Sequence, residues 1–152
     1  MLRNDQPIAL PYHSAVDYDD LLGFDMDQGA ADMGSFIVPY SCMVKLAGLV
    51  ITETNAGATT PGVVKFDKRP TAGSDTNRGD GDIAEFNLGT TAAGKMLYDE
   101  VAVGTELNPG EEVVVQLVTQ PVGGAAGHCR PVLLVEYLPE TKTNMTNMVA
   151  TT

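Results

Sequence analysis

The stretch Glu112-Val-Val-Val-Gln-Leu-Val-Thr119 decides the fold class of this chain. In an extended strand, Val113, Val115 and Leu117 lie on one face and Gln116 lies on the other. This period of two predicts a half-buried β-strand rather than a helix. A tight turn is predicted just before the strand, at residues 107–110 (Leu-Asn-Pro-Gly), because Pro and Gly preset the backbone angles that turns require.

Other apolar runs repeat this pattern along the chain and are separated by Gly-rich or Pro-rich turns. They lie at residues 35–40, 42–52, 62–66, 82–88, 95–99 and 131–138. No long amphipathic helix separates them, so the sequence predicts an all-β fold, an antiparallel β-sandwich or barrel. The side chains expected in its core are Val64, Phe66, Phe86, Val113, Val115, Leu117, Leu133 and Val135.

The chain has 152 residues, which is typical of one domain. Three segments are expected: an extended acidic arm at 1–34, a β-sandwich domain at 35–138 and a short polar C-terminal tail at 139–152. Two isolated cysteines, Cys42 and Cys129, do not make a disulfide framework, so we expect free thiols. The N-terminus has no apolar stretch long enough for a signal peptide, and we expect synthesis in a cytoplasm.

The charge balance is strongly acidic, with 20 Asp and Glu against 9 Lys and Arg and a net charge of −11. This charge repels phosphate backbones and anionic lipids, and no stripe of Lys or Arg relieves it. Nucleic acid and membrane are therefore excluded as expected partners. A basic protein surface is a better candidate.

The arm mixes aspartates with apolar side chains that follow neither a helical nor a strand period. It has no core of its own, so we expect it to attach to a capsid or to a neighbouring subunit. Two alternatives stay open, an extra edge strand on its own sandwich and a disordered tail. The expected contact residues are Tyr12, Tyr18, Leu21, Leu22 and Phe24.

No catalytic constellation is evident, and we expect the chain not to be an enzyme. His128 and Cys129 are sequence neighbours, so within one strand they point to opposite faces and cannot form a dyad. The sequence contains no His-x-His pair, so it gives no indication of a transition-metal site. Residues 73–82 are rich in oxygen ligands, but the EF-hand order fails and Arg78 repels a cation. We therefore expect no metal and no cofactor.

Residues 47–140 resemble the small jelly-roll cement or decoration proteins of tailed bacteriophage heads. The residues that carry the resemblance are Gly62-Val-Val-Lys-Phe-Asp-Lys-Arg-Pro70, Gly94-Lys-Met-Leu-Tyr98, Leu107-Asn-Pro-Gly-Glu-Glu-Val113, Pro131-Val-Leu-Leu-Val-Glu-Tyr137 and Pro139-Glu140. The match rests on pattern and order and covers about two thirds of the chain. The arm is not part of this resemblance.

The resemblance implies a jelly roll, often a homotrimer, that binds the major capsid protein on the outside of the shell. The expected function is that of a structural virion protein, located on the capsid surface, which stabilises the capsid. The alternative is a ligand-binding jelly roll, such as a carbohydrate-recognition or receptor-binding domain. The first function predicts broad contacts, whereas the second predicts a compact pocket with convergent polar and aromatic groups.

Overall fold

The computed structural model describes residues 5–9, 18–19, 22–27, 29–69 and 83–138. Within these ranges the regular elements are all β-strands. They are β1 (Asp5–Ala9), β2 (Tyr18–Asp19), β3 (Gly23–Asp25), β4 (Ala31–Ile37), β5 (Cys42–Glu53), β6 (Val63–Arg69), β7 (Ala84–Asn87), β8 (Met96–Leu107), β9 (Glu112–Thr119) and β10 (His128–Tyr137). The all-β prediction is confirmed.

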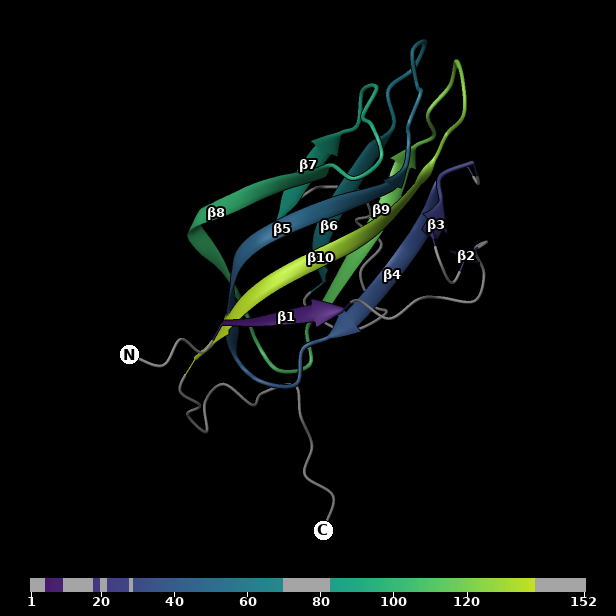
Figure 1. Cartoon of the computed structure of the whole chain (residues 1–152). Coiled ribbons are helices and arrows are strands. Elements are labelled where there is room, and N and C mark those ends of the chain that lie inside the picture. Colours follow the sequence, from purple (N-terminus) through teal and green to yellow (C-terminus); the bar gives the residue numbers. More distant parts are fainter. Residues whose placement is uncertain (1–4, 10–17, 20–21, 28, 70–82, 139–152) are drawn as a thin grey trace.

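The strands form two antiparallel sheets that pack face to face as a sandwich. Sheet A has the order β2-β3-β10-β5-β8, with β1 also paired to β10, and sheet B has the order β4-β9-β6-β7. Figure 1 shows β8, β5 and β10 as one layer in front of β7, β6 and β9. The first strand of the sandwich proper pairs with the last, the second with the second to last, and so on inward. The antiparallel pairs are β3 with β10, β4 with β9, β5 with β8 and β6 with β7. This nesting is the jelly-roll topology.

The core lies between the inner faces of the two sheets. All the predicted core side chains are buried there, and the most exposed of them, Phe86, is 7% exposed. The rings of Phe66 and Phe86 meet edge to face with centroids 5.8 Å apart, a favourable aromatic geometry. Alternation in the sequence therefore identified the inner faces of β6, β7, β9 and β10 correctly.

The strands of the sandwich begin earlier than the predicted boundary at residue 35. Strand β3 and the first residues of β4 lie inside the segment that the sequence assigned to the arm. Strand β3 pairs with the start of β10, where Phe24 is in register with Cys129. Gly23 allows this close approach, because a Cβ there would lie 2.7 Å from the Cys129 carbonyl oxygen, and its φ is +96°.

The first part of the predicted arm forms an edge strand on the sandwich. Strand β1 pairs antiparallel with β10, with Ile8 opposite Leu133. This is the edge-strand alternative, realised for residues 5–9. Residues 10–17, 20 and 21 of the arm lie outside the described residues, as do the loop at 70–82 and the tail at 139–152.

Strand β8 is much longer than the predicted run at 95–99. It pairs with β5 in two parts, because Val44 is opposite Thr105 but Leu46 is already opposite Glu100. Residues 101–104 therefore bulge out of the ladder opposite Lys45 alone. Gly104, with a φ of +75°, turns the backbone at the end of this bulge.

Candidate contact surfaces

The structure places the predicted contact residues differently from one another. Phe24 is 1% exposed and belongs to the core, so its proposed role as a surface contact is wrong. Leu22 is half-buried beside it, and its carbonyl accepts a hydrogen bond from the Thr52 hydroxyl. Tyr18 lies in β2, in backbone register with Phe24. Tyr12 and Leu21 lie outside the described residues.

The outer face of sheet A is apolar over its central strands. In β5 and β10 the buried inner residues, such as Leu49 and Leu133, alternate with half-buried apolar residues that point outward. On β8, Met96 is 40% exposed and Tyr98 is 60% exposed. We call this surface the apolar face, and it consists of Leu46, Val50, Met96, Tyr98, Val132 and Leu134.

Strand pairing brings the residues of the apolar face together from distant parts of the sequence. Gly48 of β5 is in register with Val132 on one side and with Tyr98 on the other. A Cβ at Gly48 would lie 2.4 Å from Cε of Met96, so the Met96 side chain extends across the backbone of β5. The three strands thus share one continuous surface.

The outer face of sheet B carries polar groups that are paired within the chain, beside the apolar side chains of Val114 and Ile37. Lys65 on β6 forms an ion pair with Glu85 on β7, with 3.0 Å between Nζ and Oε2. Gln116 on β9 donates a hydrogen bond from Nε2 to Oδ1 of Asp32, at 2.6 Å. Gln116 is only 6% exposed, so this hydrogen bond satisfies an amide that water hardly reaches.

One end of the sandwich carries a cluster that we call the aromatic end, defined by Ile37, Tyr40 and Tyr137. Ile37 is 57% exposed and Tyr40 is 55% exposed. The Tyr40 and Tyr137 rings meet edge to face with centroids 6.3 Å apart. Partial burial raises the pKa of Tyr137, and the nearby Cys42 and Tyr40 raise it further.

Backbone hydrogen bonds hold the turn of the aromatic end between two neighbouring segments. The Val38 N–H donates to the Glu111 carbonyl at 2.8 Å, and the Leu138 N–H donates to the Ser41 carbonyl at 2.8 Å. Sequence analysis did not select this site, because a turn residue such as Tyr40 belongs to no periodic pattern. An aromatic residue directly after Pro39 is the only signal that the sequence offers.

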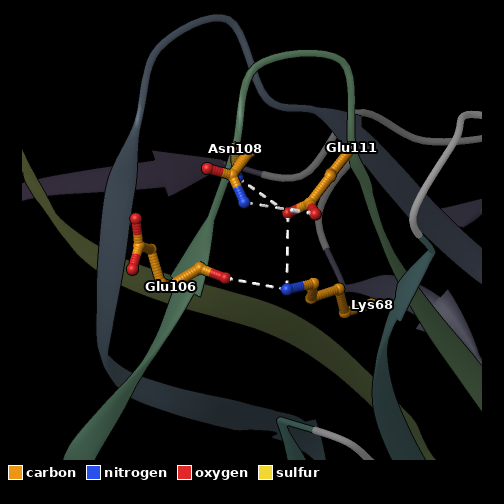
Figure 2. Close-up of polar contacts among 4 residues, drawn as sticks. All are labelled: Lys68, Glu106, Asn108 and Glu111. Carbon is orange, nitrogen blue, oxygen red and sulfur yellow. Dashed lines mark hydrogen bonds and ion pairs between the residues drawn. The ribbon is translucent and has the colours of Figure 1, made fainter. Parts of the chain in front are cut away.

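A polar cluster braces the same end of the sandwich (Figure 2). Nζ of Lys68 lies 3.0 Å from the Glu106 carbonyl oxygen and 3.5 Å from Oε2 of Glu111. The same carboxylate oxygen accepts the Asn108 N–H at 2.7 Å. Between them, Gly110 has a φ of +87°, as the third position of a type II turn requires. The cluster ties the end of β6 to the β8–β9 turn.

The opposite end of the sandwich is built from three uncharged loops. Residues 54–62, 88–94 and 120–127 contain no Asp, Glu, Lys or Arg, and Figure 1 shows them projecting together. Backbone hydrogen bonds join them, including Ala56 N–H to the Ala125 carbonyl at 2.9 Å. Val122 is 51% exposed there.

The reactive side chains lie near β10 and are not arranged for catalysis as a pair. Nδ1 of His128 lies 2.5 Å from Oε2 of Glu53, while Cys129 is buried in the core. Burial raises the pKa of Cys129 to about 12. Burial, followed by the charge of Glu111, raises the pKa of Cys42 to about 11. Both cysteines are free, as expected, and both are held as neutral thiols.

No group of three or more metal-ligating side chains is found among the described residues. That part of the chain also has no helix long and apolar enough to cross a membrane. No family model, curated protein or solved structure matches the chain. The jelly-roll assignment therefore rests on the strand pairing.

Proposed function

We propose that this chain is a structural virion protein that binds the outer surface of a phage capsid and stabilises it. It would be made in the host cytoplasm and act on the capsid surface as a cement or decoration protein. The observation that carries the proposal is the aromatic end. There, Ile37 at the end of β4 and Tyr40 in the turn that follows are more than half exposed, and backbone hydrogen bonds fix this turn on both sides.

The aromatic end has the chemistry of a protein contact. Tyr is enriched at interface hot spots because it combines a large apolar ring with a hydroxyl that can still find a hydrogen-bond partner. Full burial of a large apolar side chain contributes roughly 1.5–3 kcal/mol. Because backbone hydrogen bonds already fix the turn, binding costs little loop entropy.

The charge of the chain favours a basic partner. A net charge of −11 attracts a positively charged surface on the major capsid protein over long range and accelerates encounter. The proposed homotrimer would present three aromatic ends at once. Weak single contacts then combine through effective concentration into stable attachment.

Co-sedimentation with capsids tests the proposal. The purified chain is mixed with capsids assembled from the major capsid protein of a tailed bacteriophage. Ile37→Ser together with Tyr40→Ala should abolish co-sedimentation, because it removes the exposed apolar cluster. Val122→Ser is the matched control, since it removes an equally exposed apolar residue from the opposite end. Full binding by the double variant would refute the role of the aromatic end.

A deletion of residues 1–21 tests the arm separately. It leaves β3 in place, whose Phe24 belongs to the core, but it removes β1 and β2 together with their backbone pairings to β10 and β3. Lost capsid binding with little change in the free energy of unfolding would support the arm as an attachment element. Unchanged binding would remove the arm from the proposal, and the absence of any binding by the intact chain would refute the capsid function as a whole.

The alternative function, ligand recognition, is favoured by one observation. The exposed ring of Tyr40 offers a platform on which a sugar could stack. Glycan binding that disappears in Tyr40→Ala, combined with no capsid binding by the intact chain, would favour a carbohydrate-recognition domain.

A further inference from the structure

Strand β8 forms an open edge of sheet A. Within the described residues β8 pairs with β5 alone, and Figure 1 shows it on the outer side of that strand. The Ile51 N–H donates to the Lys95 carbonyl at 2.8 Å, so this carbonyl and the backbone groups of Leu97 and Asp99 point toward β5. Those of Met96 and Tyr98 alternate with them and point toward the open edge.

The sequence of this edge is complementary to itself when it is reversed. Lys95-Met-Leu-Tyr-Asp99 has opposite charges at its ends and places Met and Tyr on either side of Leu97. In an antiparallel pair centred on Leu97, Lys95 opposes Asp99 of the second copy and Met96 opposes Tyr98 of the second copy. Opposite charges in register stabilise a strand pair, and a thioether beside an aromatic ring is a favourable contact.

The side chains needed for this pairing are available. Lys95 and Asp99 are exposed, and neither has an ion-pair partner in the described part of the chain. They cannot pair with each other, since four residues of extended strand separate them by about 13 Å. Met96 and Tyr98 lie exposed on the apolar face.

We propose that two copies of this chain pair through β8, antiparallel and about a two-fold axis at Leu97. Met96 of each copy then exchanges backbone hydrogen bonds with Tyr98 of the other, and the two copies of sheet A become one continuous sheet. The contact covers an open strand edge, which proteins otherwise have to protect. It is isologous, as a two-fold contact requires.

Local backbone features limit the pairing to this segment. The bulge at 101–104 interrupts the strand after Glu100, and Gly94, with a φ of +79°, ends it before Lys95. The neighbouring register, centred on Tyr98, would place Met96 opposite Glu100 and leave Lys95 without a charged partner. The axis at Leu97 is therefore favoured. The short ladder predicts a dimer that dissociates on dilution.

The two-fold contact is independent of the proposed capsid function. A two-fold contact is not the contact that closes a three-fold ring, so in a homotrimer it would join one trimer to the next. Its test needs only the purified chain, so capsid binding can fail while the contact stands, and the reverse also holds.

Charge reversal tests the register. Lys95→Asp and Asp99→Lys should each weaken association through β8 by about tenfold, equivalent to about 1.4 kcal/mol, as measured by sedimentation equilibrium. The double variant should restore the association. Asp99→Lys is the decisive single change, because it moves the net charge from −11 to −9 (−11 + 2) and so reduces general repulsion. Association that is unchanged or stronger in Asp99→Lys would overturn the proposal.

Disulfide cross-linking tests the same register without relying on affinity. Lys95→Cys and Asp99→Cys chains, mixed and mildly oxidised, should form a cross-linked heterodimer. Neither variant alone should cross-link, since each new cysteine would then oppose a native Asp or Lys. The native Cys42 and Cys129 are buried and do not interfere. Absence of the heterodimer, or equal cross-linking by either variant alone, would also overturn the proposal.

Discussion

The outer faces of the two sheets differ sharply. On sheet B, Lys65 pairs with Glu85 and Gln116 pairs with Asp32, so polar groups are satisfied within the chain. On sheet A, apolar residues from three strands form the apolar face, and β8 leaves an open edge beside it. Both sheets bury their inner faces equally well, so the difference does not arise from the needs of the core.

This difference indicates where contacts with other molecules should form. Strands such as β6 alternate apolar and polar residues, which is the pattern of a sheet with one solvated face. Strands β5 and β10 are apolar on both faces over much of their length. An exposed apolar patch on a soluble protein often marks an interaction site. Sheet A is therefore the sheet through which copies of the chain are expected to meet.

The largest difference in the free energy of unfolding is expected between substitutions at two adjacent positions of β10, one on each face of the sheet. Leu133 is fully buried on the inner face, so Leu133→Ala should lower the free energy of unfolding by about 2–5 kcal/mol. Leu134→Ser on the outer face should lower it by about 1 kcal/mol or less. Urea unfolding of both variants measures the difference. Equal losses would mean that the apolar face is part of the folding core.

An intermediate loss of the free energy of unfolding is expected from a substitution on the outer face of sheet B. Asp32→Ala removes the acceptor of a nearly buried amide and should cost about 1–3 kcal/mol. Adding Gln116→Leu should recover part of this loss, because no amide is then left without its partner. Thermal and urea unfolding measure both variants. A neutral Asp32→Ala variant would contradict the view that this face depends on paired polar groups.

Alkaline pH should lower the stability of the folded chain through its two thiols, which lie on the inner face of sheet A. The pKa of Cys129 is raised from 9.0 to about 12 in the folded chain. Between these values the unfolded thiol loses its proton while the folded thiol keeps it, so stability falls as pH rises from 9 toward 12. The expected slope is about 1.4 kcal/mol per pH unit for this group.

Cys129→Ala tests this assignment, because it should reduce the slope between pH 9 and pH 11 in urea unfolding curves by about 1.4 kcal/mol per pH unit, while Cys42, whose pKa is also raised, keeps its own contribution. At pH 7 to 8 the stability of the parent chain should not change with the ionisation of this thiol. An equal alkaline slope in the variant and the parent would show that other groups cause the effect.

The smallest effects are expected from exposed ion pairs, which occur on both outer faces. Lys65→Ala breaks the pair with Glu85 on sheet B, and Lys45→Ala breaks the pair with Glu136 on sheet A. Each carboxylate is more than 40% exposed, so each loss should be below about 1 kcal/mol and should shrink at high salt. A larger loss on one face would show that its charges act as a network.

The sequence alone determined the fold class and the inner faces of the regular strands. Residues such as Val64, Phe66 and Leu117 were predictable because a period of two is a local property of the chain. The turn after Leu107 was predictable for the same reason, since Pro109 and Gly110 set their own backbone angles. Both cysteines were correctly expected to be free.

Only the tertiary structure decided which strands pair and which side chains they bring together. Phe24 stands in a strand too short to show a period, and its burial depends on a pairing with Cys129, which lies far away in the sequence. The apolar face likewise depends on the register that aligns Val132, Gly48 and Tyr98. Such non-local pairings are set by the packing of the whole chain. For that reason local periodicity identified the core but neither the aromatic end nor the open edge of β8.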